Sequence, residues 1–541
     1  AEAVIVKMLH LDLVALASEK DAALERLRSL GAVHIDFSHA CGAGVAAARG
    51  ELEDAGKAVR LILKARGKDR DCEIRPAGVA QVLAIDADRA KLSEAAEALR
   101  REIAIYAPYG DFDPALAKKL IDSGVDLSGV AELPAKLPAM RLSKMREKLA
   151  RIENRIAIDM AKIAMCDEKA ILAQHPSLSD ALEFAAAMET MGEQGKLAFV
   201  SGWIPEPKTG KLRAAARENG WGALLREAED GENPPTLIEP PKIFRPVKAL
   251  FEGLGIAPGY SESDVSVPFM CYFSLFFAML VGDGAYGAIF LAATLLARRK
   301  LPKAWFTLLC VFSCATVLWG LLSNTWFGAA LPFAKEWPTA RWLAGEGAEP
   351  GREYDNMMFL CFTIGVTHLV LARVWSGISK INSLSCVSEF GWAGIIVFMY
   401  VLTNNIVGIF GGVPAWSCWM FGVSFLAVFA QAKGIDKGML FLNTMSVLGD
   451  IISYVRLFAV GLASVKVAQN FNSMAVGLAL PVWIKWLPLA LILLIGHGLN
   501  LAMAALSVLV HAVRLNTLEF SNHKGISWAG YAFKPFAKTK E

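Results

Sequence analysis

A charged residue interrupts a long apolar stretch of this 541-residue sequence. Arg456 stands within residues 438–470, where a membrane helix is expected, and its guanidinium stays charged at any physiological pH. Placing it at mid-membrane costs roughly 2.5–3.5 kcal/mol on insertion scales, so it needs water or a partner. Three roles remain open. Arg456 could form a structural ion pair with an acid such as Asp450 or Glu389, could act in an ion path, or could snorkel to the interface, although the length of the stretch argues against snorkelling.

A second arginine, Arg514, lies near the end of the last apolar stretch, 482–515. Residues three, four and seven positions apart share one face of a helix. That spacing gives Arg456 small and polar neighbours, which let another group come close: Gly449, Ser453, Ala459 and Ala463. It gives Arg514 a polar stripe of His511, Ser507, Asn500 and Thr517. Snorkelling suits Arg514 better, and His511 and His497 fit hydrogen-bonded packing as well as proton relay.

The elements that must position these arginines are apolar stretches in the second half of the chain, at 267–297, 304–327, 357–376, 388–410, 415–432, 438–470 and 482–515. A helix needs about 20 apolar residues to cross a bilayer. Basic loops such as 298–303 alternate with acidic or uncharged ones, as the positive-inside rule requires. A turn at Gly282-Asp283-Gly284 would let the first apolar stretch enter the membrane and return to the same side. Asp283 would then lie at a helix end and would not carry an ion.

We therefore predict about eight membrane helices, or seven as the fallback, in a multi-pass cell-membrane protein with both termini cytoplasmic. The last two apolar stretches exceed what an upright crossing needs, which predicts long, tilted helices. No internal repeat is evident, which weakens a secondary-transporter interpretation.

The first half of the chain has the pattern of a soluble α/β region. Strands are expected at 1–13, 32–37 and 196–205, and helices at 43–65, 88–107 and 209–220. A further helix at 18–31 would be capped by Ser18 and ended by Gly31. Apolar residues then recur every three or four positions at Leu142, Met145, Leu149, Ile152 and Ile156. This heptad seam predicts either a helical hairpin or an ordinary bundle helix.

The predicted fold class is thus two-part. Cytoplasmic α/β lobes with a helical hairpin occupy 1–245, a proline-rich connector occupies 246–265, and an all-α polytopic membrane domain occupies 266–541. The hydrophobic fraction of 55% and the mean hydropathy of +0.41 agree with a large membrane part.

Several classes of function are disfavoured by missing patterns. The sequence has no GxxxxGK[ST] phosphate loop, so nucleotide binding by that route is not expected. Its nine cysteines are scattered without a CxxC pair, which disfavours a zinc site or a disulfide framework. The basic excess lies in loops of the apolar half, so nucleic-acid binding is not expected either. We predict no cofactor, no metal site and no catalytic residues.

Five motifs together resemble subunit I of bacterial and archaeal A/V-type ATPases, the homologue of subunit a of eukaryotic V-ATPases. They are "LGDIISYVRLFAVGLAS", "VRLNTLEF" followed by "GISWAGYAFKPF", "PGYSESD", "FFAMLVGDGAYG", and "VSGWIPEP" followed by "PPT". The resemblance covers nearly the whole chain and is strongest from Ser201 onward.

This resemblance implies a non-catalytic membrane stator subunit that conducts H⁺ or Na⁺ in a rotary ATPase. Its tilted final helices would face a rotor ring of proteolipids (K or c), each carrying a carboxylate. The family's essential arginine corresponds to Arg456, and its second functional arginine corresponds to Arg514. The soluble half would hold the peripheral stalks (E and G), next to the central-stalk adaptor (C or d).

The implied chemistry fits the bare residues. A fixed guanidinium favours the ionised form of a passing carboxylate and repels a cation that would leak directly between two half-channels. The acid that eukaryotic members carry on the last helix is replaced here by Ala504, so Arg514, His511, Ser453, Asn500, Ser507 and Glu519 are the other candidates for ion translocation. Two alternatives stay open: a stand-alone secondary ion carrier with a cytoplasmic regulatory domain, and a purely structural membrane anchor.

Overall fold

The computed structural model describes residues 5–37, 40–67, 74–123, 137–229, 231–334, 336–347, 349–350, 352–478 and 481–538. Contacts within it divide the chain into two compact units. The sheet unit comprises Met8–Ala228 with Lys534–Glu541, and the membrane unit comprises Ala1–Lys7 with Glu229–Phe533. The predicted limits of the functional domains, at residues 245 and 265, stay a prediction.

A five-stranded antiparallel sheet forms the core of the sheet unit, as far as that unit is described. The strands are β1 Met8–Leu16, β2 His34–Ile35, β3 Gly192–Gln194, β4 Leu197–Pro205 and β5 Gly222–Glu227, in the order β2-β4-β1-β5 with β3 also paired to β4. Residues along the first half of β4 alternate between exposed and buried, as pleating requires when one face is covered. Helix α1, Lys20–Leu30, contributes Leu24 and Leu27 to the same apolar cluster as β1 and β4.

Most of the predicted elements of this unit are present. Helices α2 Ala43–Arg66 and α7 Thr209–Glu218 lie where the sequence predicts them, and Gly31 ends α1 in the left-handed conformation with φ of 56°. The prediction of Ser18 as a helix cap is wrong. Ser18 lies in a 3₁₀ turn, Ala17–Glu19, and that tighter turn moves the cap position to Glu19, whose side chain makes no capping bond.

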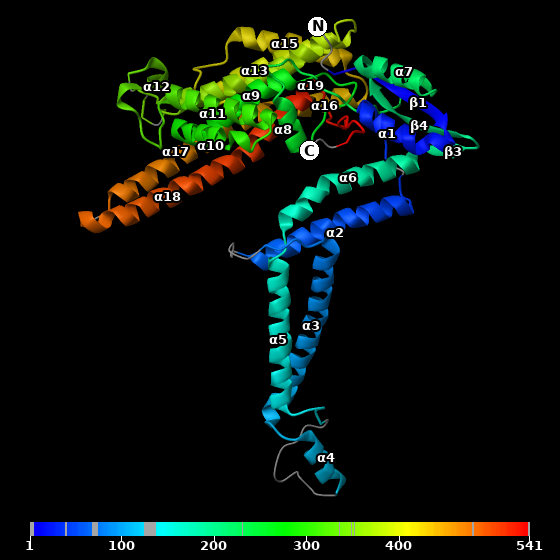
Figure 1. Cartoon of the computed structure of the whole chain (residues 1–541). Helices are drawn as coiled ribbons and strands as arrows, with labels where there is room; N and C mark the ends of the chain where they lie inside the picture. Colours follow the sequence, from blue (N-terminus) through cyan, green and yellow to red (C-terminus); the bar gives the residue numbers. More distant parts are fainter. Residues whose placement is uncertain are drawn as a thin grey trace. The chain divides into compact units, whose positions relative to one another are not determined.

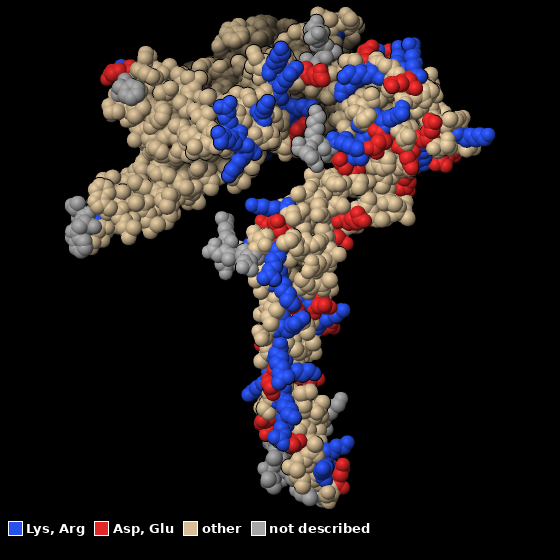
Figure 2. Space-filling view, viewed as in Figure 1, with Lys and Arg blue, Asp and Glu red and all other residues tan. Residues whose placement is uncertain are grey.

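Four long helices and a short one extend the sheet unit: α2, α3 Val79–Tyr106, α4 Pro114–Asp122, α5 Leu142–Ala164 and α6 Glu168–Thr190. Helix α5 packs along α3, and α2 packs along α6 (Figure 1). Leu142 and Met145 of the heptad seam are buried, so the expected packing of this helix against another one is confirmed. Charged side chains of both signs cover the visible face of the α3–α5 pair (Figure 2).

The membrane unit is helical. Its helices are α8 Val247–Leu254, α9 Ser266–Val281, α10 Gly284–Leu296, α11 Lys303–Ser323, α12 Pro338–Leu343, α13 Asp355–Ser379, α14 Ser385–Ile406, α15 Ala415–Gln431, α16 Ile435–Ser453, α17 Val455–Val476, α18 Val482–Ser507 and α19 Ser521–Lys524. One apolar cluster joins α9, α11, α13, α14 and α16 and holds Phe276, Phe362 and Tyr454 fully buried.

Five helices in the described residues are long and apolar enough to cross a membrane, or six if the α9–α10 pair counts as one span. A shorter apolar helix, α15, accompanies them. The chain is therefore a multi-pass membrane protein, while the count of about eight crossings and the cytoplasmic position of both termini remain predictions.

The turn expected at Gly282-Asp283-Gly284 is confirmed. Helices α9 and α10 meet there at a bend of 118°. Gly282 ends α9 with φ of 70°, and Asp283 caps α10 by accepting a hydrogen bond from the Ala285 backbone N–H. Backbone N–H groups of Phe327 and Gly328 also donate to the Asp283 carboxylate, so this residue fixes a helix end and a loop, as predicted.

The last two long helical segments run as 437–476 and 484–524. Helices α17 and α18 lie side by side along most of their length (Figure 1), and their visible surface is almost free of charge (Figure 2). The first segment breaks at Tyr454, so Arg456 is the second residue of α17 and not the middle of one regular helix. The second segment passes after α18 into two π-helical turns, Val508–Ala512 and Leu515–Phe520. The predicted tilt stays a prediction.

Candidate functional site

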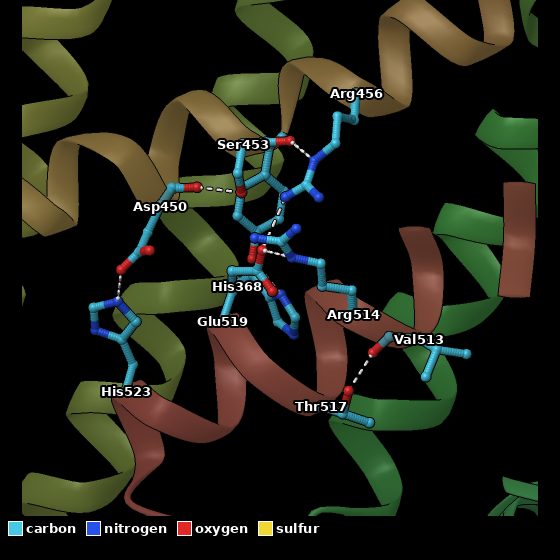
Figure 3. Close-up of polar contacts among 10 residues, drawn as sticks. His368, Asp450, Ser453, Arg456, Val513, Arg514, Thr517, Glu519 and His523 are labelled. Atoms are coloured by element: carbon cyan, nitrogen blue, oxygen red, sulfur yellow. Dashed lines mark hydrogen bonds and ion pairs between the residues drawn. The ribbon is translucent and has the colours of Figure 1, made fainter. Parts of the chain in front are cut away.

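Arg456 lies at the start of α17, where its guanidinium is oriented by two acceptors. Its Nε donates a hydrogen bond to the Ser453 carbonyl oxygen over 2.8 Å, and its Nη2 donates to Glu519 Oε1 over 2.9 Å (Figure 3). The break at Tyr454 leaves the Ser453 carbonyl free to accept this bond. The local chain thus aims the guanidinium at the last helical segment.

Glu519 is shared by two arginines. Arg514 Nε lies 3.3 Å from the same Oε1 atom that accepts from Arg456 (Figure 3). The Glu519 side chain is 5% exposed, whereas the side chains of Arg456 and Arg514 are 22% and 55% exposed. The other carboxylate atom, Glu519 Oε2, has no hydrogen-bond partner among the described residues. The trio therefore carries one excess positive charge, and part of it reaches the surface of the unit.

The π turn explains why residue spacing did not reveal this pair. Arg514 and Glu519 are five positions apart, which in an α-helix places two side chains on different faces. Hydrogen bonding in a π-helix links residues i and i+5, and the turn Leu515–Phe520 brings the two side chains together. The partners predicted for Arg514 assumed α-helical spacing. π turns occur often at functional sites.

Of the other candidate residues, Ser453 and His511 lie near the two arginines in the chain, whereas Asn500 forms hydrogen bonds elsewhere. Ser453 contributes its carbonyl to Arg456, while its hydroxyl donates to the Asp450 carbonyl oxygen. His511, one turn before Arg514, is half-buried, and its Nδ1 has no partner among the described residues. Asn500 instead donates to Tyr286 and to the Ser464 carbonyl. Ser507 is half-buried and ends α18.

The predicted acidic partners of Arg456 are engaged elsewhere. Asp450 Oδ2 accepts from His523 Nε2 over 3.0 Å, and Glu389 pairs with Arg373 and Lys380 over 3.0 and 2.6 Å. Of the roles left open for Arg456, an ion pair with an acid is present, but the acid is Glu519 and not Asp450 or Glu389, the two examples considered from the sequence. Packing of α13, α14 and α16 gives both acids nearer cations, which leaves Glu519 as the partner of Arg456.

Sequence reasoning missed His523 and Arg373, which connect these acids. Arg373 Nε donates to His523 Nδ1 over 3.2 Å. Because guanidinium nitrogens only donate, Nδ1 must accept, and the ring proton lies on Nε2, where it is donated to Asp450. A short polar row thus runs Lys380–Glu389–Arg373–His523–Asp450 beside the arginine pair. Nothing in the sequence spacing connects His523 with Arg373, since they lie 150 positions apart.

The arrangement can bind an additional anion. Two guanidinium groups share one carboxylate oxygen, and Arg514 is half exposed, so a carboxylate that approaches from outside can compete with Glu519 for either arginine. Ala504, at the position where an acid was expected, is buried at 3% exposure and supplies no charge. Among the described residues, no group of three or more His, Cys, Asp or Glu side chains could hold a metal ion.

Comparisons with known proteins agree on one kind of relative. The chain is 33% identical to V-type ATP synthase subunit I of Borreliella burgdorferi over 66% of this chain and 62% of that protein. It is 28% identical to V-type ATP synthase subunit I 1 of Treponema pallidum over 98% of this chain and 99% of that protein. It is 25% identical to A-type ATP synthase subunit I of Methanocaldococcus jannaschii over 75% and 64%. No protein-family model matches the chain.

Proposed function

We propose that this chain, a homologue of subunit I of V-type and A-type ATP synthases, is the membrane stator subunit of a rotary ATPase. Its relatives are subunits of such a complex by name, and its own apolar helices make it a multi-pass membrane protein. In this role it would be non-catalytic and would couple the movement of H⁺ or Na⁺ to rotation.

The observation that carries the proposal is the pair of arginines on one buried carboxylate. A rotor-ring carboxylate that reaches Arg456 can replace Glu519 as its anionic partner, so the guanidinium is never left without one. Its positive charge favours the ionised rotor acid and thereby releases the bound ion. The same charge repels a cation that would pass straight across.

The partners follow from this role. The rotor ring would be built of proteolipids (K or c) and would pass the α17–α18 pair. The sheet unit, with its α3–α5 pair, would bind the peripheral stalks (E and G), and the central-stalk adaptor (C or d) would complete the assembly. Ion half-channels would lead to Arg456 from the two sides of the membrane.

The test is ATP-driven ion uptake by vesicles that contain the complex with Arg456→Ala. We expect uptake to be abolished, because the rotor acid would lose the charge that ionises it. Arg341→Ala is a matched control, since Arg341 also pairs with a glutamate of the membrane unit, Glu346, but both side chains are about half exposed. Normal uptake by the Arg456→Ala complex would contradict the proposal.

A further inference from the structure

A second polar cluster lies on the α17–α18 pair, well away from the arginines. Asn500 and Tyr286 are almost completely buried, at 0% and 1% exposure. Asn500 Nδ2 donates to Tyr286 Oη over 3.0 Å and to the Ser464 carbonyl over 2.8 Å. Tyr286 Oη lies 2.7 Å from His497 Nδ1, and His497 Nε2 lies 3.2 Å from Asn472 Oδ1. Three helices, α10, α17 and α18, therefore contribute to one hydrogen-bonded row.

The donors and acceptors give this row a single direction. An amide nitrogen can only donate, so Tyr286 Oη accepts from Asn500 and is left to donate its own proton to His497 Nδ1. The ring proton of His497 then lies on Nε2 and is donated to Asn472 Oδ1, whose amide nitrogen donates onward to the Phe327 carbonyl. Each hydrogen bond of the row is therefore donated in the direction of Asn472.

The hydrogen-bonded row extends along the second half of α17. Ser464 stands eight residues after Arg456 in α17, or about 12 Å along the helix axis, and Asn472 stands about 12 Å further on. Asn472 is only half-buried and lies close to the end of α17, which is Val476. The row therefore leads from a buried point midway along α17 to the end that is distant from Arg456.

Its inner end is incomplete. Asn500 Oδ1 is buried and has no hydrogen-bond partner among the described residues, although both amide protons of Asn500 are used. A buried carbonyl oxygen of this kind requires a donor, such as a water molecule, to avoid the cost of desolvation. A donor bound there would lie beside Tyr286 Oη, the next acceptor of the row.

We propose that Tyr286 and His497 form a proton relay between the buried end at Asn500 and the end of α17 near Asn472. This rests on the proposed function, which supplies a protonated rotor acid as the proton source. A proton that reaches Tyr286 Oη through water is matched by transfer of the hydroxyl proton to His497 Nδ1. The imidazolium then releases its Nε2 proton to water beside Asn472, and rotation of the hydroxyl and the ring restores the row.

This relay would carry H⁺ and not Na⁺. Tyr286 and His497 are in direct hydrogen-bond contact at 2.7 Å, which leaves no room for Na⁺ between them. The ring of Phe327 packs edge-on against both Tyr286 and His497, at 5.8 and 5.2 Å between centroids, and holds the two side chains in place.

The test is ATP-driven acidification of vesicles that contain the complex with His497→Ala. We expect uptake about tenfold or more slower than in the parent complex, because a positioned proton carrier is lost. Added imidazole should restore uptake severalfold by entering the space of the lost ring, an effect that a merely structural role would not produce. Tyr286→Phe, which removes one oxygen atom, should slow uptake as well.

Tyr400→Phe is the matched control, because the Tyr400 hydroxyl bonds to Thr363 between two other helices. Unchanged uptake in both relay variants, or slowed uptake that imidazole does not raise, overturns the relay. If His497→Ala does not assemble, normal uptake by Tyr286→Phe rejects it. The Arg456→Ala variant distinguishes the relay from the proposed function. Normal uptake by Arg456→Ala refutes the stator role. If Arg456→Ala abolishes uptake but His497→Ala and Tyr286→Phe leave it normal, only the relay is refuted.

Discussion

At the scale of single residues, one buried carboxylate organises the site. Glu519 pairs with two guanidinium groups that the chain brings from different helical segments. A buried ion pair adds little net stability, but removal of one partner leaves a charge without compensation and is costly. Glu519 is therefore both the resting partner of Arg456 and a structural requirement of the arginine pair.

Glu519→Gln should lower the stability of the membrane unit, because Arg456 and Arg514 would then face each other without an anion. The expected loss is about 1–3 kcal/mol, the usual cost of a buried hydrogen-bonding group that is left unpaired, because both guanidinium groups keep some contact with the surface. The melting temperature of the purified complex in detergent measures it. Glu346→Gln removes an exposed ion pair and should change that temperature little. Equal melting temperatures for both variants would contradict the organising role of Glu519.

At the scale of elements, the position of α17 depends on a close approach of glycine backbones. An added Cβ at Gly461 would lie 2.5 Å from the Met279 carbonyl oxygen, and one at Gly282 would lie 3.2 Å from the Gly461 carbonyl oxygen. Helix α17 can therefore lie directly against the end of α9 only because these residues have no side chain. This contact sets where Arg456 and Ser464, on either side of Gly461, come to lie.

Gly461→Ala should push α9 and α17 apart and destabilise the membrane unit by about 1–3 kcal/mol, as overpacking usually does. Gly449→Ala is the matched control in the preceding helix, α16, where an added Cβ meets nothing within 4 Å. Since alanine favours a helix over glycine, this control should be neutral or stabilising by up to about 1 kcal/mol. Thermal denaturation of the two variants compares them, and similar losses in both would argue against the close approach.

The sequence predicted elements better than their contacts. The apolar stretches, the turn at Gly282-Asp283-Gly284 and the heptad seam of α5 appear where expected, because they depend on local spacing. The pairing of Arg514 with Glu519 was missed because a π turn changes which residues share a face. The partner of Asp450, His523, was missed because it lies 73 positions away, and the partner of Glu389, Arg373, was missed because the preceding helix α13 supplies it.

At the scale of the whole chain, the C-terminal tail belongs to the sheet unit. Phe536 is buried at 2% exposure, and its backbone N–H donates to the Val33 carbonyl. His34 Nδ1 lies 2.9 Å from the Lys534 carbonyl oxygen, and Lys538 pairs with Glu25 over 2.6 Å. The sheet unit is therefore completed by residues that follow the last membrane helix, which sequence spacing did not predict.

His34 makes this tail sensitive to pH. Burial lowers the pKa of its imidazole below the ordinary value, against smaller opposing effects of the Lys534 carbonyl and Asp36. A lowered pKa in the folded state means that the stabilising contribution is present above about pH 6.5 and is lost as the pH falls toward the folded pKa. We expect a protease to release the tail faster at pH 5.5 than at pH 7.5, when each rate is divided by the rate of the same protease on an unfolded peptide at that pH.

Limited proteolysis at the two pH values, followed by mass spectrometry, measures this release. His34→Gln should reduce the difference between the two pH values, since it removes the titrating ring. His175→Gln changes an exposed histidine of α6 and should leave the difference intact. If His34→Gln leaves the pH difference unchanged, the difference comes from another titrating group.

The sequence by itself determined that this is a two-part protein with an apolar helical half, a charged residue in its penultimate long stretch and a family resemblance that the relatives support. These properties follow from composition and local periodicity, which can be read from the sequence without knowing how the helices pack. Only the tertiary structure decided that Arg456 and Arg514 share Glu519, and that Asn500 joins Tyr286 and His497 instead. Those pairings depend on the π turn, on the glycine contact between α9 and α17, and on helices far apart in the chain.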